Sequence, residues 1–269
     1  MRKLFAVATA AVLALTLSAC GSTAAPETAA DTLKIGATPT PHAEILTYIA
    51  KELAPKKGLK LEIVEFSDYV PLNPQLQEGQ LDANYFQHRP YLEDYNKEKG
   101  ANLVYVQSVH LEPLGLYSSK IDDLGALATG ATVAVPNDAT NLGRGLKLLA
   151  DNGVITLKEG AGVTATERDI AANPKQLVFK ALDAAQIPRA LQDVDAAVIN
   201  GNYAIEAALN PITDALVAER AEGNPYANGL VVAEGKQNDP RIAKLVELLK
   251  SPEVKAFVEK TYKGAVIIA

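Results

Sequence analysis

The first half of the chain alternates between short apolar runs and apolar positions at helical spacing. Thr40 and Pro41 form an N-cap and a first-turn proline. The apolar positions after them recur every three or four residues, at Ile45, Leu46, Ile49 and Leu53. This pattern predicts a helix there and further helices at 73–78 and 90–99. Short apolar runs predict strands at 33–37, 59–66, 81–86, 102–109 and 114–117.

A second series of the same kind begins near Ser118. Its apolar runs predict strands at 131–135, 196–199, 214–218 and 230–233. Its helical spacing predicts helices at 142–149, 203–209, 240–249 and 254–262. Strands that alternate with helices indicate an α/β fold with mixed, mainly parallel sheets flanked by helices.

Two series of similar length indicate two lobes. We expect the closing helices to return to the first lobe, which gives lobe 1 residues 33–116 and 229–269 and lobe 2 residues 117–228, with two crossing segments at the hinge. Open α/β sheets bind ligands beyond the carboxyl ends of their strands, so two facing sheets predict a cleft that a hinge can close. The alternative is a single three-layer domain.

The N-terminal segment has the pattern of an export signal. Arg2 and Lys3 are followed by an uncharged apolar run at 4–19, which is short for a membrane-spanning helix. The sequence Leu-Ser-Ala-Cys at 17–20 resembles the bacterial lipobox, in which the cysteine carries a diacylglycerol. We therefore expect a signal peptide at 1–19, and a lipidated Cys20 with a flexible tether at 20–32. The alternative is an ordinary signal with a chance cysteine.

Charge and cysteine content narrow the function further. The 269 residues include 26 basic and 32 acidic ones, and loss of residues 1–19 removes two basic residues, which takes the net charge from −6 to −8. No basic block is present, so we do not expect nucleic-acid binding. Cys20 is the only cysteine, which excludes an internal disulfide and a thiolate metal cluster.

Four polar or aromatic clusters follow predicted strand ends or lie at the second crossing. The first could form an aromatic slot for an apolar or sulfur-containing side chain. It comprises Tyr69, Phe86, His88 and Tyr91. The bland alternative is core packing for Phe86 and Tyr91 and a surface position for His88.

The second cluster, at 136–145, opens a predicted helix and carries Asn141 and Arg144 between glycines. A helix start and a guanidinium fork both favour a carboxylate; the alternative is an exposed cationic helix residue. The third cluster contributes Asn200 and Asn202, one of which could simply cap a helix. The fourth contributes Asn228, alternatively a turn residue. Together the four clusters fit a free amino acid, with its carboxylate on Arg144, its ammonium on amides and its side chain among rings.

Three other functions remain open. Catalysis is disfavoured because no G-x-S-x-G elbow, P-loop or HExxH helix occurs, and we expect no cofactor. A metal receptor could use His42, His88 and His110 with a carboxylate such as Glu112, although none of them has a paired spacing. An envelope adhesin or scaffold would have no enclosed small-molecule cleft.

The chain resembles the NlpA family, the methionine-binding lipoproteins of bacterial ABC importers. The matching stretches are LKIGATPTPHAEIL (33–46), LDANYFQHRPYLEDYN (81–96), VAVPNDATNLGRGLKLL (133–149), AVINGNYA (197–204) and NPYAN (224–228). The resemblance implies a two-lobed periplasmic-binding-protein type 2 fold, a lipid anchor that faces the periplasm or the cell exterior, and a permease with its ATPase subunit as partners.

The resemblance also implies roles for individual residues. Tyr69, Phe86, His88 and Tyr91 would enclose a thioether side chain, and Arg144 would hold the carboxylate. Asn202 and Asn228 would bind the head group, with Asn200 as a further contact. The implied ligand is methionine, as the L- and also the D-enantiomer. The alternatives are a methionine-containing dipeptide or another small amino acid.

Overall fold

The computed structural model of the protein describes residues 32–269. The predicted signal peptide, Cys20 and the tether up to residue 31 lie outside the described residues. Thr32, which the sequence assigned to the tether, is the first residue of strand β1 (Thr32–Ala37). No helix within residues 32–269 has the length and apolar character needed to cross a membrane.

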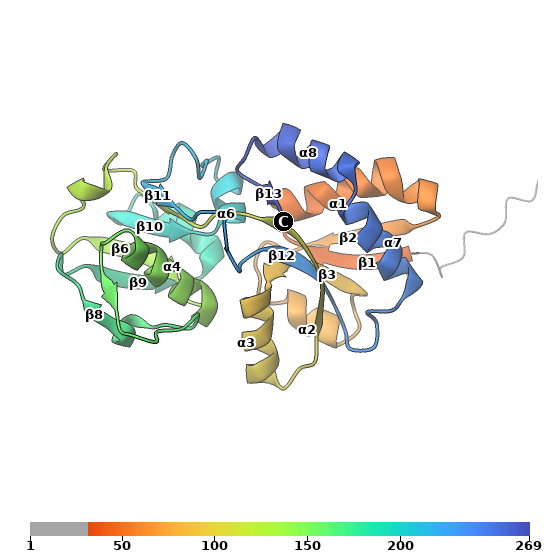
Figure 1. Ribbon diagram of the computed structural model, residues 1–269, viewed down its shortest axis with the longest axis horizontal. Helices are drawn as coiled ribbons and strands as arrows, with labels where there is room; N and C mark the ends of the chain where they lie inside the picture. Colours follow the sequence, from red (N-terminus) through yellow and green to blue (C-terminus); the bar gives the residue numbers. More distant parts are fainter. Residues whose placement is uncertain (1–31) are drawn as a thin grey trace, which may run out of the picture. The chain divides into compact units, whose positions relative to one another are not determined.

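One lobe is built on a six-stranded sheet with the order β13-β4-β12-β3-β1-β2 (Figure 1). Strands β2 (Lys60–Glu65) and β3 (Ala83–His88) run parallel to β1 on either side. Strand β12 (Asn228–Val232) runs antiparallel to β3 and to β4 (Val104–Leu111), and β13 (Ile267–Ile268) closes the edge.

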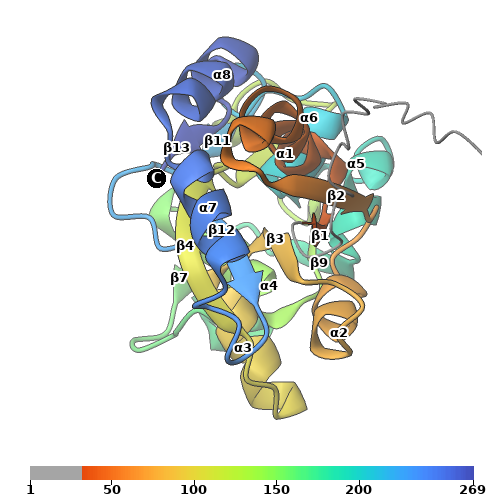
Figure 2. The ribbon, with the colours of Figure 1, turned by 90° about the vertical axis from the view of Figure 1, so that its right-hand side faces the viewer.

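Helices cover both faces of this sheet because its central strands alternate their side chains between two apolar clusters. Leu230 and Val232 of β12 face one cluster, and Val231 faces the other. The first cluster is covered by α1 (Glu44–Tyr48, extended by helical turns at Pro39–Ala43 and Ile49–Leu53), α7 (Pro240–Leu249) and α8 (Pro252–Tyr262). The second is covered by α2 (Leu72–Gln77) and α3 (Arg89–Lys99) (Figure 2).

The second lobe is built on a five-stranded sheet with the order β11-β5-β10-β6-β9. Its strands are β5 (Gly115–Tyr117), β6 (Thr132–Pro136), β9 (Val178–Leu182), β10 (Ala196–Ile199) and β11 (Val217–Ala218). Helix α4 (Ala139–Asp151) packs on one face, and α5 (Ile187–Ala190) and α6 (Gly201–Glu206) pack on the other. A separate hairpin pairs β7 (Thr156–Leu157) with β8 (Ile170–Ala172).

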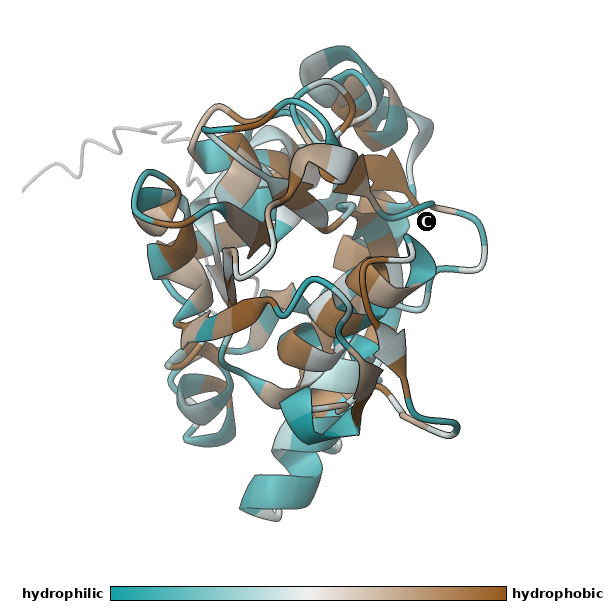
Figure 3. Ribbon diagram, turned by 90° about the vertical axis from the view of Figure 1, so that its left-hand side faces the viewer, coloured by the Kyte–Doolittle hydropathy of each residue, from teal (hydrophilic) through white to brown (hydrophobic). Residues whose placement is uncertain are grey.

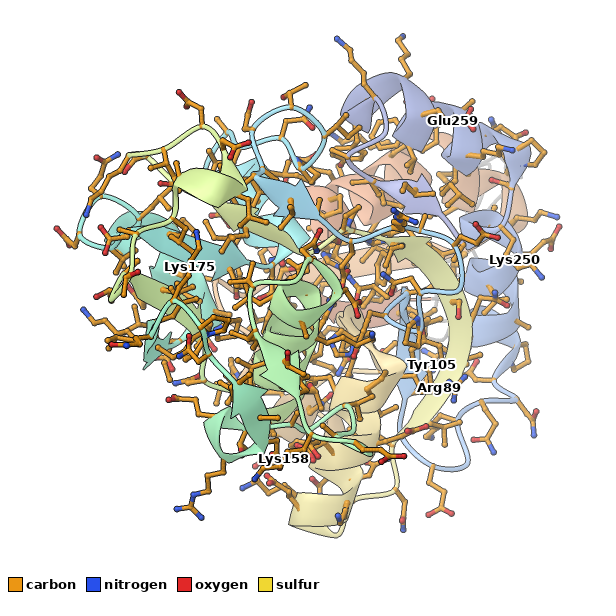
Figure 4. The ribbon with its side chains drawn as sticks, turned by 60° about the vertical axis from the view of Figure 1, so that its left-hand side comes forward. Arg89, Tyr105, Lys158, Lys175, Lys250 and Glu259 are labelled. Atoms are coloured by element: carbon orange, nitrogen blue, oxygen red, sulfur yellow. The ribbon has the colours of Figure 1, made fainter. Side chains whose placement is uncertain are left out.

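Apolar residues are concentrated on the strands and on the helix faces turned toward them (Figure 3). On the outer surface, contacts between long side chains also join neighbouring elements. The guanidinium carbon of Arg89 lies 4.4 Å from the ring centroid of Tyr105, so this contact ties the start of α3 to β4 (Figure 4).

The chain passes between the two sheets twice. We call residues 112–114, between β4 and β5, the first crossing segment, and residues 219–227, between β11 and β12, the second. The two are bonded to each other, since the backbone N–H of Glu219 donates to Leu114 O at 2.9 Å and Leu114 N donates to Glu219 Oε2 at 3.1 Å.

The predicted α/β fold with two lobes is therefore confirmed, with more antiparallel pairing than expected. The strands next to the crossings, β4, β5, β11 and β12, all pair antiparallel, whereas the pairs β1–β2, β1–β3, β6–β10 and β6–β9 are parallel. The boundary predicted at 116/117 falls inside β5, and the one at 228/229 falls after the first residue of β12. The division of residues between the lobes stays a prediction.

Candidate functional site

A cavity lies between the carboxyl ends of the strands of the two sheets. The space between its side chains, including the solvent-open part, is about 310 Å³. All nine residues predicted as ligand-binding line it, together with Gln87, Glu112 and Gly201. The nine are Tyr69, Phe86, His88, Tyr91, Asn141, Arg144, Asn200, Asn202 and Asn228.

Three aromatic rings form one wall of the cavity. Tyr69 comes from the loop after β2, Phe86 from β3 and Tyr91 from the first turns of α3. Their ring centroids lie 5.7 to 6.0 Å apart, in tilted and edge-on arrangements. Tyr203 of α6 contacts Tyr69 from the other lobe at 5.0 Å. This wall is apolar and polarisable, which suits a thioether or aliphatic side chain.

His88 is buried between the lobes, not exposed as the bland alternative had it. Its Nδ1 accepts from the backbone N–H of Tyr91 at 3.1 Å and caps α3, which leaves its proton on Nε2. Nε2 then donates to Asn141 Oδ1 of the other lobe at 3.2 Å. Burial, followed by the nearby charge of Arg144, lowers the pKa of His88 to about 3, so the ring is neutral at pH 7.

This pKa predicts how stability depends on pH. Below pH 6.5 the unfolded chain binds a proton at His88 that the folded chain does not bind until about pH 3. The free energy of unfolding is therefore expected to fall by about 1.4 kcal/mol per pH unit between those values from this residue alone. Chemical denaturation of wild type and His88→Asn between pH 7 and 4 measures the difference; equal slopes would contradict it.

A chain of hydrogen-bonded amide side chains lines the cavity, and two buried polar atoms there have no partner. Asn141 Nδ2 donates to both carboxylate oxygens of Asp138 at 3.0 Å, so its Oδ1 accepts from Asn200 Nδ2 at 2.9 Å. Asn200 Oδ1 is buried and unpaired as a result. Asn202 Oδ1 accepts from the Tyr69 hydroxyl at 2.5 Å, and Asn202 Nδ2 is buried and unpaired.

At the start of α4 one of the backbone donors that the sequence predicted for a ligand is already taken. The Asp138 side chain caps the helix by accepting from Asn141 N at 2.9 Å, so the protein's own carboxylate occupies this position. At α6 the reverse holds. Asn200 sits at the N-cap position, but its side chain makes no capping bond and points its amide to Asn141 instead.

Arg144 is buried rather than exposed, and its fork is largely occupied. Nε donates to Glu219 Oε1 at 2.7 Å and Nη2 donates to Glu219 Oε2 at 2.6 Å. Nη2 also donates to the backbone oxygen of Glu112 at 3.1 Å, and the guanidinium carbon lies 4.4 Å from the ring centroid of Tyr226. The bidentate hydrogen bonding predicted for a ligand carboxylate is therefore made with Glu219, and Nη1 of Arg144 takes no part in these bonds.

The sequence did not single out Glu219, although it fixes the plane of Arg144 from the second crossing segment. It also did not place Glu112 in the cavity as a binding group, because that residue was considered only as a metal ligand. Gln87 lines the cavity and is held from behind by Asn73 and Asn84, through bonds of 2.6 to 3.0 Å. Gln87 lies next to His88 in the segment 81–96 that the sequence analysis quoted, whereas no pattern in the sequence marks Glu112 or Glu219.

The four residues of the metal hypothesis do not form one group. His42, His110 and Glu112 come together, with their ligand-type atoms within 4.8 Å of one another, whereas His88 belongs to the amide chain described above. In this group His110 Nε2 lies 2.5 Å and His42 Nε2 3.3 Å from Glu112 Oε1, and the first of these contacts is a hydrogen bond.

A fold of two α/β lobes, joined by two crossing segments around a polar cavity with an aromatic wall, is that of a solute-binding protein. A family model described as NlpA lipoprotein matches residues 33–269. The chain belongs to this family, which confirms the resemblance noted in the sequence.

Relatives match over nearly their whole length. The chain is 42% identical to the methionine-binding lipoprotein MetQ of Bacillus subtilis (strain 168), over 99% of this chain and 98% of the relative. It is 38% identical to the D-methionine-binding lipoprotein MetQ of Escherichia coli (strain K12), over 98% and 97% of the two chains. A solved nutrient binding protein from Burkholderia cenocepacia bound to methionine has a TM-score of 0.85 and 45% identity, covering 88% of this chain and 99% of that one.

Proposed function

We propose that the protein is a non-enzymatic receptor that captures methionine between its lobes and delivers it to the permease of an ABC importer. The observation that carries this proposal is the pair of unpartnered buried atoms in the cavity. Asn200 Oδ1 is an acceptor and Asn202 Nδ2 is a donor, and both lie beside the aromatic wall. An acceptor and a donor together match the ammonium and carboxylate of a zwitterion, since unpaired buried polar atoms are costly.

The proposed arrangement of the ligand follows from these polarities. The carboxylate takes a hydrogen bond from Asn202 Nδ2 and faces Nη1 of Arg144. The ammonium donates to Asn200 Oδ1, with Asn228 and Glu112 on its other side. The side chain lies against Tyr69, Phe86, His88 and Tyr91, where burial contributes about 1.5–3 kcal/mol and sulfur–aromatic contacts add about 0.3–1.5 kcal/mol.

In this proposal the receptor has an open and a closed state, and the ligand binds the closed state more tightly. In the closed state the lobes are already bonded through Tyr69 to Asn202 and through His88 to Asn141. The hydroxyl of Tyr203 adds a third bond, to Ser67 O at 3.3 Å. A ligand that contacts both lobes strengthens this state, and the closed form then docks on the permease, which an ATPase subunit drives.

Calorimetric titration of residues 21–269 with L-methionine tests the proposal. We expect exothermic or entropy-driven saturation with one site per chain and a raised melting temperature, because a ligand that binds only the folded state stabilises it. No heat and no thermal shift at millimolar methionine would refute methionine as the ligand.

Parallel titrations resolve the ligand class. D-methionine and a methionine-containing dipeptide test the two alternatives in the same cavity, and mass spectrometry of small molecules that copurify with the protein identifies a retained ligand directly. A turnover screen with amino-acid esters and peptides tests the non-enzymatic part of the proposal; hydrolysis that survives purification and is lost with cavity variants would refute it.

The proposed location is the outer face of the cell membrane, facing the periplasm or the exterior. It rests on the lipobox-like sequence at 17–20, with a lipid on Cys20 and residues 21–31 as a tether. As a flexible linker these eleven residues would span roughly 17–20 Å, which would keep the receptor near its permease.

A further inference from the structure

A cluster of buried polar side chains lies directly behind the cavity. His42 comes from the turn before α1, His110 from β4 and Glu112 from the first crossing segment. The side chains of His42 and His110 are fully buried, and that of Glu112 is 3% exposed. Glu112 lines the cavity, so this group connects the interior of the first lobe to the site.

The hydrogen bonds of the cluster fix where its protons are. Tyr85 donates its hydroxyl proton to His110 Nδ1, so His110 carries its own proton on Nε2 and donates it to Glu112 Oε1 at 2.5 Å. Asn228 Nδ2 lies 3.3 Å from His42 Nε2, which therefore accepts, and His42 Nδ1 donates to Thr38 Oγ1 at 2.7 Å. Burial lowers the pKa of His42 to about 3, so this imidazole is neutral, and both nitrogens of each ring have a partner.

The carboxylate of Glu112 makes no ion pair with a Lys or Arg side chain of residues 32–269. Its neighbour His42 is neutral, and Arg144, which donates to the backbone oxygen of Glu112, is paired with the carboxylate of Glu219. Burial acts to raise the pKa of Glu112, but the histidines and the bond from Asn228 outweigh it and lower this pKa, so the carboxylate is ionised. Its bonds all fall on Oε1, and Oε2 takes no part in them.

We propose that His42, His110 and Tyr85 are positioning residues that hold the ionised carboxylate of Glu112 toward the cavity as the counter-ion of the ligand's ammonium group. The cluster then makes the receptor selective for ligands with a free α-ammonium. This inference rests on the proposed function, because it assigns one end of the same ligand.

The cluster also sets the orientation of Asn228. Its Nδ2 is committed to Glu112 Oε1 and His42 Nε2, at 3.3 Å each. Its Oδ1 is therefore the atom left for the ligand, and an amide oxygen accepts from an ammonium but cannot accept from a carboxylate. Two acceptors, Glu112 and Asn228, are thus placed together by one hydrogen-bond network.

The test compares methionine with its analogue that lacks the amino group, 4-(methylsulfanyl)butanoate, by calorimetry at pH 7.5. Wild type is expected to bind methionine at least about 100-fold more tightly than the analogue. A ratio of this size lies within the coupling energies measured for close charge pairs. In Glu112→Gln this preference is expected to shrink to less than about 10-fold, through weaker methionine binding and unchanged or tighter analogue binding. Glu259→Gln, on the exposed side of α8 (Figure 4), is the matched control and keeps the wild-type ratio.

Two variants of His110 test positioning without touching the carboxylate. His110→Gln retains a side-chain N–H that can donate to Glu112, whereas His110→Met has none. We expect His110→Gln to keep most of the preference for methionine and His110→Met to lose about tenfold or more of it, with analogue binding as the readout of an intact cavity. Equal ratios in the two variants would refute positioning.

The outcomes separate this inference from the proposed function. If wild type does not bind methionine, the proposed function fails. If wild type binds methionine but shows no preference over the analogue, or if Glu112→Gln keeps the preference, only this inference fails. Equilibrium dialysis with zinc provides a third check, because one tightly bound zinc per chain that is lost in Glu112→Gln would identify the cluster as a metal site and overturn the inference.

Discussion

Replacement of Arg144 by alanine is expected to weaken methionine binding by about 100-fold or more. The substitution removes the guanidinium that lines the cavity, and with it the Nη1 donor proposed to face the ligand's carboxylate. It also leaves Glu219, whose side chain is 11% exposed, without the partner that now binds both of its oxygens. The free energy of unfolding is therefore expected to fall as well, by about 3 kcal/mol. Calorimetry and urea denaturation measure the two effects.

The double variant Arg144→Ala/Glu219→Gln separates the effect on methionine binding from the effect on stability. Neutralising Glu219 removes the unpaired buried charge, so stability is expected to recover by more than half while methionine affinity does not. Arg144→Lys keeps the charge without the planar fork and is expected to lie between wild type and Arg144→Ala in affinity. Unchanged affinity in Arg144→Ala would refute the role of this residue at the carboxylate.

Replacement of Cys20 by serine is expected to release the protein from the membrane altogether. Stable anchoring requires two acyl chains, and a serine in this position takes no diacylglycerol. Cell fractionation should move the protein from the membrane pellet to the soluble fraction, and mass spectrometry should show the loss of the lipid. Methionine affinity is expected to stay unchanged, because residue 20 precedes the body that forms the cavity.

Ser22→Ala, in the adjacent tether, is the matched control and should remain with the membrane. If Cys20→Ser also remains with the membrane, the lipobox hypothesis is wrong. If wild type and Cys20→Ser are both found in the soluble fraction, the segment is an ordinary signal and the cysteine at its end is incidental.

The sequence predicted the strands that lie at the centre of a sheet, because their burial produces a clear apolar pattern. Strands β3 and β10 are buried along their whole length and β6 along all but its first residue, and polar residues at or after the ends of these strands reach the cavity. Strand β9 was not predicted, because it lies at the sheet edge and most of its residues are exposed, Lys180 among them. The two-residue strand β13 is too short to have any periodicity.

Most of the residues that line the cavity could be predicted because they lie in segments that follow a strand, whereas their partners could not. Glu219 reaches Arg144 across 75 positions, and Asn228 reaches His42 across 186. Such contacts depend on how the two crossing segments bring the lobes together, which no local pattern encodes. The N-cap of α4 is different, because Asp138 and Asn141 are only three positions apart and an aspartate at the N-cap is a local signal, although the sequence interpretation assigned this place to a ligand.

Three hydrogen bonds join the two lobes beside the cavity: Tyr69 to Asn202, His88 to Asn141 and Tyr203 to Ser67. Each of them connects an atom of one lobe to an atom of the other, so separating the lobes breaks all three. Side chains that act in this way affect the rate at which the cavity opens as well as the affinity for a ligand, and residues that never touch the ligand, such as Ser67, can therefore change how long it stays bound.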